Sequence, residues 1–269
     1  MMTTATLPIY WRVWRRFLAL AVVRLLEYRV SFLLSLVDTA AQLGLLAVTY
    51  LVFYRFTDEV AGWSRADALV LLGVYWVFDG VWRFQFAGNL ARLSQLIRRG
   101  NLDFLLLRPL PSPFLVACWQ GMDLQQGGKI IQGLLLTAYA GHLAGVAWSL
   151  GRVAGACLFG LCGLALLHAL RFAIATCTFW VMQTDALYEL FYSLFTAARF
   201  PVTYFRQPVR GVLTYGVPVA FATTFPAQAL LGRADYSLLL VGLLLSAAAL
   251  VAANRFWHFA IRTYSSTSS

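Results

Sequence analysis

The chain has 269 residues, of which 61% are hydrophobic and 12% charged, and its mean hydropathy is +0.72. Soluble proteins carry about 25% charged residues, so this composition excludes a soluble globular domain. The formal net charge of +10 is typical of nucleic-acid-binding proteins, but here the arginines lie beside apolar runs. That arrangement fits phospholipid headgroups, and we expect membrane lipids rather than nucleic acid as partners.

The apolar residues form continuous runs of about 20 residues, the length that crosses ~30 Å of hydrocarbon as a helix. Backbone polar groups in lipid must be satisfied within the protein, and continuous rather than alternating runs favour helices over a closed barrel. We therefore predict an all-α polytopic membrane protein in which residues 1–269 form a single transmembrane domain.

The first predicted element is an amphipathic helix over residues 9–28. A helical wheel separates its basic side chains from its apolar ones: Arg12, Arg15 and Arg16 share one face, and Trp11, Trp14, Phe17 and Leu18 share the other. Helices with this division lie in the headgroup plane of a membrane, so we expect an interfacial helix. The alternative is that these residues are a ragged start to the first span.

Six membrane spans are expected after this helix. The fourth is long enough to need a tilt, and the fifth is interrupted by a proline, Pro201. Polar residues blur the start of the third. The predicted spans cover about residues 30–54, 68–87, a stretch within 114–146, 153–182, a stretch from 186 onward, and 238–259.

The longest polar connector, residues 88–113, lies between the second and third spans. Its first half predicts a short helix with one apolar stripe. We expect a glycine to end this helix beside two arginines, and an aspartate to cap the helix that follows. A stripe outside the membrane needs a partner surface, and we expect a soluble motor protein to supply it. The residues predicted to couple to this partner are Leu90, Leu93, Ile97, Arg98, Arg99, Gly100, Asp103 and Pro109.

Arginine counts predict the orientation of the spans. Five arginines precede the first span and four lie in the 88–113 connector, so both segments are expected in the cytoplasm. An even number of spans then places both termini in the cytoplasm as well. The membrane itself is expected to be the plasma (inner) membrane. If residues 212–225 cross the membrane fully rather than re-entering it, the C-terminus moves to the other side.

Residues 200–231 are apolar but punctuated by prolines and glycines, too broken for a plain helix. Irregular backbone at membrane depth is tolerated where protein or a water-filled cavity satisfies it. We predict a re-entrant or outer-leaflet hairpin, with a surface loop as the alternative. Arg199, Arg206 and Arg210 would then meet outer headgroups, the favoured reading, or an acidic substrate on exit.

The search for catalytic, cofactor-binding or metal-binding residues finds none. A Gly-Gly-Lys fragment at Lys129 lacks the spacing and the hydroxyl residue of a phosphate-binding loop, and the histidines are scattered. Ionisable residues within spans usually face an interior or a cavity. Two such pairs are candidates for a translocation pathway: Asp38 with Gln42, and Asp79 with Arg83. A structural ion pair is an equal alternative for Asp79 and Arg83.

Gly100, Leu102, Asp103, Leu106 and Pro109 match a Gly-x-Leu-Asp-x-x-Leu-x-x-Pro pattern position by position. In this respect the chain resembles the ABC-2-type transporter permeases, in which this pattern follows a cytoplasmic coupling helix between the second and third spans. The interfacial helix, the six spans and the broken hairpin are also similar to the family, so the resemblance covers nearly the whole chain.

This resemblance implies a membrane subunit of an exporter, without catalytic activity of its own. A separate ABC ATPase would hydrolyse ATP with Mg²⁺, and a second permease, identical or homologous, would complete the transporter. We expect the pore at the interface of the two permeases, near the first, second and fifth spans. The alternatives are a secondary transporter, for which we find no convincing internal repeat, and a membrane assembly protein that transports nothing.

Overall fold

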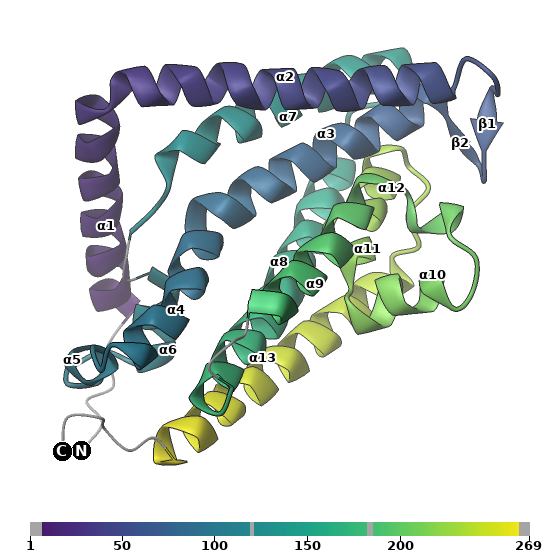
Figure 1. Cartoon of the computed structure of the whole chain (residues 1–269). Helices are drawn as coiled ribbons and strands as arrows, with labels where there is room; N and C mark the ends of the chain where they lie inside the picture. Colours follow the sequence, from purple (N-terminus) through teal and green to yellow (C-terminus); the bar gives the residue numbers. More distant parts are fainter. Residues whose placement is uncertain (1–6, 119–120, 182–184, 264–269) are drawn as a thin grey trace.

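The computed structural model describes residues 7–118, 121–181 and 185–263. Most of these residues are helical, and the described part of the chain also contains one short hairpin (Figure 1). In chain order the elements are α1 (Leu7–Glu27), α2 (Arg29–Phe53), β1 (Glu59–Val60), β2 (Trp63–Ser64), α3 (Arg65–Trp82), η1 (Arg83–Ala87), α4 (Gly88–Arg98), α5 (Leu102–Leu106), α6 (Ser112–Cys118), η2 (Leu124–Gln126), α7 (Gly127–Leu143), α8 (Leu150–Thr176), η3 (Cys177–Phe179), α9 (Asp185–Thr196), η4 (Ala197–Arg199), η5 (Val202–Tyr204), α10 (Val209–Gly211), η6 (Val212–Gly216), α11 (Val219–Ala222), α12 (Thr224–Leu230) and α13 (Ser237–Thr263).

Three helical segments of the described residues are long and apolar enough to cross a membrane: α2, residues Leu150–Phe179 (α8 with η3), and α13. The helices at the expected second and third spans, α3 and α7, have 18 and 17 residues, and α9 at the fifth has 12. The all-α architecture of a membrane protein agrees with the sequence analysis. That the chain crosses the membrane six times stays a prediction.

Glycines let α3 and α7 pack with their backbones in contact. A Cβ atom added to Gly133 would lie 2.6 Å from the backbone N of Val77, and one added to Gly73 would lie 2.7 Å from the backbone N of Thr137. Small residues at such positions are what allow helices to approach closely in lipid, where apolar burial gives no drive to associate. The two glycines therefore fix the α3–α7 pair.

A second group is built on α8, which packs against α11, α12 and α13. A Cβ atom on Gly163 of α8 would lie 2.7 Å from the Cα of Ala222, so α11 reaches the backbone of α8. Most side chains of α11 and α12 are buried in this contact. Asp235 holds the start of α13, because the hydroxyl and the backbone N–H of Ser237 both donate to its carboxylate and keep its pKa below the ordinary value.

The two ends of the molecule are built differently. At one end, the β1–β2 hairpin lies beside the short helices of residues 200–231 (Figure 1). Trp63 donates to the Thr203 hydroxyl at 3.0 Å, and the Tyr54 and Tyr204 hydroxyls hydrogen-bond to each other. At the other end lie α4, α5 and α6, together with the start of α1 and the end of α13.

The chain turns sharply between α1 and α2, at Tyr28 (Figure 1). Arg12, Arg15 and Arg16 of α1 are exposed, whereas Trp14 and Phe17 are half-buried. Because α2 has the length of a membrane span, a helix that turns away from it at this corner runs across the span direction. This geometry suits the expected interfacial helix, whose place at a membrane surface stays a prediction.

Candidate functional site

The 88–113 connector begins as a continuation of α3. The chain passes through the π-helical turn η1 into α4 without leaving a helix. Gly100 adopts a positive φ of 69° and its N–H bonds to the carbonyl of Ile97, while the N–H of Asn101 bonds to that of Leu96. This pair of bonds is a Schellman motif, which explains why the sequence places a glycine there.

The apolar stripe of α4 does not face outward. Leu90 and Leu93 are fully buried and Ile97 is 9% exposed, because α4 packs this stripe against α6 and α8. The expectation that these three residues offer a surface to a partner is therefore wrong. A short helix joined to a bundle buries its apolar side on its own chain first, and leaves its polar side, here Arg92, Gln95 and Arg99, exposed.

The expected cap of the following helix is also corrected. α5 starts with Asn101 as its N-cap, and no side-chain capping bond is made there. Asp103 lies inside the first turn instead, where its negative charge still suits the positive end of the helix dipole. Pro109 is exposed beyond the end of α5, and the side chain of Arg98 lies outside the described part of the structure.

In contrast to the buried stripe of α4, two large apolar side chains are exposed in α5 and at its C-cap. Phe104 is 69% and Leu107 82% exposed, whereas Leu102 and Leu105 are buried. Phe104 and Leu107 are three residues apart and so lie on one side of the helical turn. The sequence alone does not reveal them, because a continuous apolar run from Phe104 to Leu107 does not show which side chains face the bundle.

Asp79 and Arg83 form the expected ion pair, and a third residue joins them. The Arg83 Nε lies 2.9 Å from Asp79 Oδ1, and the Lys129 Nζ of α7 lies 2.7 Å from Asp79 Oδ2. Asp79 and Lys129 are buried, and the ammonium also lies 4.6 Å from the ring centroid of Trp76. In the sequence, Lys129 is one of the polar residues at the start of the third predicted span and part of a Gly-Gly-Lys fragment. Nothing in the linear pattern shows the proximity of α7 to α3.

The buried cluster extends to α9 through Arg83, whose Nη2 donates to the Tyr192 hydroxyl at 2.7 Å. Near it on α8, the buried guanidinium of Arg171 lies 4.4 Å from the ring centroid of Tyr188 and 4.8 Å from that of Phe191. These aromatic faces attract a cation by their quadrupole. An ion pair thus joins α3 to α7. Cationic side chains contact α9 from two elements, Arg83 from η1 and Arg171 from α8.

Asp38 and Gln42 lie elsewhere. Gln42 donates to Asp38 at 2.8 Å, and both side chains are exposed on α2. The opposite side of α2 faces α7, where Gln132 donates to the Thr39 hydroxyl and to the Leu36 carbonyl. Within one chain, the structure therefore does not bring the four candidate pathway residues into one site.

The three arginines of the predicted outer hairpin differ in their surroundings. Arg206 and Arg210 are exposed and lie one helical turn apart. Arg199 is half-buried, its guanidinium lies 5.4 Å from the ring centroid of Phe200, and its carbonyl accepts from the Tyr50 hydroxyl. Arg206 and Arg210 can therefore meet an external anion, whereas Arg199 is held within the fold.

A family model described as ABC-2 family transporter protein matches residues 40–268. The chain belongs to this family. An ABC-2 family member is a membrane component of an ABC transporter and works with an ABC ATPase, so the motif at residues 100–109 and the apolar helices have a common explanation. No curated protein and no solved structure matches the chain significantly. Within the described residues, no three His, Cys, Asp or Glu side chains gather as metal ligands would.

Proposed function

We propose that the chain is one of two permease subunits of an ATP-driven exporter, and that the exposed side of its α5 segment contacts the ABC ATPase. ATP and Mg²⁺ would bind on that ATPase. The observation that carries the proposal is the exposure of Phe104 and Leu107 in the segment that bears the family pattern. Together with two exposed arginines of the same segment, Arg99 at the end of α4 and Arg108 directly after Leu107, they form what we call the α5 surface.

The α5 surface has the composition of a docking site. Protein interfaces bury an apolar centre within a polar rim, and aromatic and arginine side chains are enriched in them. Phe104 and Leu107 would be the centre, and Arg99 and Arg108 the rim. The buried stripe of α4 then has a different role, which is to hold the α5 surface in place on α6 and α8.

A double substitution tests this contact. Phe104→Asp with Leu107→Asp should leave the fold intact, because both side chains are exposed, and should abolish copurification of the cognate ABC ATPase and stimulation of its ATP hydrolysis. The matched control is Phe56→Asp, since Phe56 is 85% exposed and lies in the α2–β1 connection at the opposite end of the molecule. A double variant that still binds and stimulates the ATPase at the rate of the unmodified chain contradicts the proposal.

The arrangement of the two ends supports a cytoplasmic position for both termini. The start of α1, the end of α13 and the α5 surface all lie at one end (Figure 1). If the ATPase binds that end, the termini lie on its side of the plasma (inner) membrane, and the β1–β2 hairpin and residues 200–231 lie on the outer side. Arg206 and Arg210 would then face outer headgroups or an acidic substrate on exit.

A second permease, identical or homologous, would cover α2. This helix has the length of a span, yet most of its surface is exposed, and Asp38 lies on that exposed surface. An ionisable residue facing lipid at span depth costs about 2.5–3.5 kcal/mol on insertion scales. A partner subunit removes that contact with lipid and places Asp38 and Gln42 at the interface, where we propose the translocation pathway.

Cysteine cross-linking tests the position of the interface. In a chain carrying Cys157→Ser to remove an exposed thiol, Gln42→Cys should give cross-linked permease dimers in the membrane. The control is Leu244→Cys on the exposed side of α13. Dimers through residue 244 but none through residue 42 would place the interface elsewhere.

Transport assays distinguish the alternative functions. Transport that an ion gradient drives without the ATPase would favour a secondary transporter. The absence of any transport would favour an assembly protein.

A further inference from the structure

An apolar groove lies along the seam between the two groups of helices, the α3–α7 pair and the group built on α8. Its volume is about 470 Å³, within the range of about 300–1,000 Å³ found for ligand sites. The described residues that line it include no charged side chain, and the hydroxyl of Thr137 is already bonded to the Gly133 carbonyl. The groove is open at the surface, because Leu134 of α7 and Leu161 of α8 are exposed. Its chemistry therefore suits an apolar ligand.

The groove has the length of one half of a bilayer. On α8 its lining runs from Val153, in the first turn of the helix, to Leu164. At about 1.5 Å per residue this stretch covers about 16 Å, which is about half of the ~30 Å of hydrocarbon that a span crosses. α8 together with η3 is long and apolar enough to be such a span. In a membrane-spanning α8 the groove begins at the membrane surface and ends near the middle, as a single acyl chain does.

A glycine of α8 keeps the groove open. Gly160 lies in its lining, and a Cβ atom added there would meet nothing within 4 Å. Gly163 differs, since its added Cβ would lie 2.7 Å from the Cα of Ala222. Glycine in the interior of a helix costs about 1 kcal/mol relative to alanine, and close packing of helices is a common reason for it in membranes. Close packing does not explain Gly160, whereas the space that it leaves for a ligand does.

A cation lies at the surface end of the groove. Arg152 directly precedes Val153, and its guanidinium lies beside Gly232, because a Cβ atom added to that glycine would be 2.6 Å from Nη2. Leu230, in the same stretch of chain, lines the groove. Among the described residues the guanidinium has no hydrogen-bond or ion-pair partner. A guanidinium forms charge-assisted hydrogen bonds with phosphate oxygens, which it matches in geometry.

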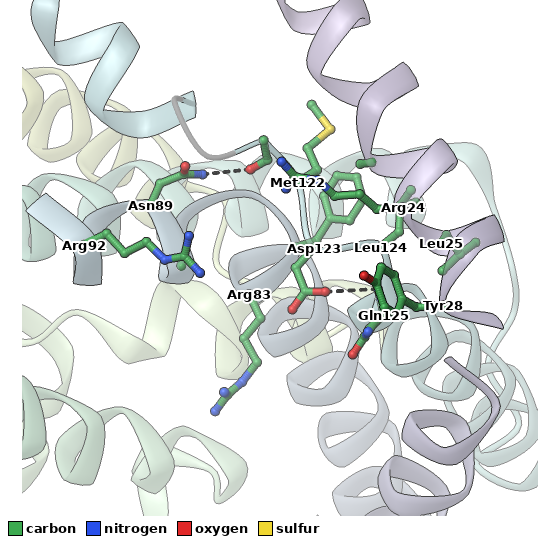
Figure 2. Close-up of a pocket in the computed structure, with 14 residues that line it drawn as sticks. Arg24, Leu25, Tyr28, Arg83, Asn89, Arg92, Met122, Asp123, Leu124 and Gln125 are labelled. Atoms are coloured by element: carbon green, nitrogen blue, oxygen red, sulfur yellow. Dashed lines mark hydrogen bonds between the residues drawn. The ribbon is translucent and has the colours of Figure 1, made fainter. Parts of the chain in front are cut away.

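The polar pocket at the end of the molecule that carries α4 is different. It lies between α1 and α4, with η1 and residues 121–125 as further walls (Figure 2). Its Asn89 amide donates to the Gly121 carbonyl at 3.0 Å, and Arg24 and Arg92 have partners within the chain as well. The arginines of that pocket are therefore engaged, whereas the cation at the groove is not.

We propose that the groove holds one acyl chain of an anionic phospholipid, and that the phosphate of this lipid binds Arg152. The lipid belongs to the leaflet on the side of the β1–β2 hairpin, because Arg233, next to Gly232, donates to the Gly62 carbonyl of that hairpin. A chain in the groove contacts α3, α7 and α8 at once and so joins the two groups of helices. This binding does not depend on the proposed contact with the ATPase.

Native mass spectrometry tests the binding on the whole chain, taken from vesicles of phosphatidylcholine mixed with phosphatidylglycerol. We expect preferential retention of phosphatidylglycerol. Gly160→Leu fills the groove and Arg152→Gln removes the cation, and each should lower this retention on the order of tenfold, equivalent to about 1.4 kcal/mol. The matched controls are Ala154→Leu, on the exposed side of α8 outside the groove, and Arg65→Gln, which removes an exposed arginine at the same end of the molecule. Both controls should retain the lipid.

Photolabelling locates the acyl chain. Phosphatidylglycerol that carries a diazirine in one acyl chain should label residues 153–164, and Gly160→Leu should abolish this label whereas Ala154→Leu should keep it. Equal retention of the two lipids by the unmodified chain, or labelling that Gly160→Leu leaves unchanged, overturns the proposal. If Gly160→Leu lowers the melting temperature more than Ala154→Leu does, the comparison of Arg152→Gln with Arg65→Gln decides, and equal retention in that pair overturns the proposal.

Discussion

The Lys129 ammonium of α7 lies 2.7 Å from the Asp79 carboxylate of α3, and both side chains are buried. The contact is possible because the two helices approach closely here: a Cβ atom on Gly80 would lie 2.8 Å from the side chain of Ile130. Arg83 shares the same carboxylate, so one negative charge balances two positive ones. The pair therefore joins two helices that the glycines bring together.

Asp79→Asn should cost more stability than Lys129→Met. Removing the carboxylate leaves two cations without their partner, for which we expect a loss of about 3–5 kcal/mol. Removing Lys129 leaves Asp79 paired with Arg83, and the loss should be nearer about 1.5–3 kcal/mol. Unfolding of the purified variants in detergent measures the difference. Equal losses of stability in the two variants would show that pairing with Arg83 does not compensate Asp79 for the loss of Lys129.

Gly133→Ala should destabilise the α3–α7 pair. The added Cβ meets the backbone of Val77 at 2.6 Å, a contact that no side-chain rotation can relieve, and overpacking of this kind costs about 1–3 kcal/mol. Gly44→Ala on α2 is the control, because nothing lies within 4 Å of its added Cβ. We expect it to be neutral or slightly stabilising, since alanine favours helix more than glycine. Thermal unfolding compares the two, and equal effects would contradict the close approach.

Leu93→Ala and Leu107→Ala should have opposite consequences. Leu93 is fully buried, so its truncation should cost about 2–5 kcal/mol of stability. Leu107 is 82% exposed, and its truncation should change stability by less than about 0.5 kcal/mol while weakening ATPase stimulation. Melting temperature and ATP hydrolysis, measured on the same preparations, separate the two roles. If the Leu93→Ala variant is fully stable but stimulates ATP hydrolysis only weakly, the α4 stripe, and not the α5 surface, is the docking surface.

Arg206→Gln with Arg210→Gln should lower transport and leave ATPase association unchanged. Both side chains are exposed at the end opposite α5, where they are proposed to meet headgroups or an acidic substrate. Arg199→Gln is a useful comparison, since the half-buried Arg199 should affect stability as well. Association is measured by copurification. If the double variant loses the ATPase instead, these arginines lie in the cytoplasm and the proposed topology is wrong.

The sequence predicted those features that depend on local chemistry. Continuous apolar runs indicated membrane helices, and Gly100 indicated the end of α4, because a left-handed residue after a helix favours glycine. The pattern from Gly100 to Pro109 led to the family that the comparison then showed. Asp79 and Arg83 were paired correctly, since a spacing of four residues places both on one helical face.

What the sequence could not supply was the packing of elements distant in the chain. The stripe of Leu90, Leu93 and Ile97 looks the same whether it faces a partner or its own bundle, and only the positions of α6 and α8 decide between them. Lys129 pairs with Asp79 across 50 positions of sequence, a contact set by the helix packing. The pocket between α1 and α4 likewise depends on where residues 121–125 fold back.

Site-specific photo-cross-linking tests whether the α5 surface contacts the ABC ATPase. A photoreactive amino acid replaces Leu107 in one preparation, Leu93 in a second and Phe56 in a third, each in membranes that contain the cognate ATPase. We expect a cross-link to the ATPase from position 107 and none from the buried position 93 or from position 56 at the opposite end. A cross-link from position 56, with none from position 107, would contradict it.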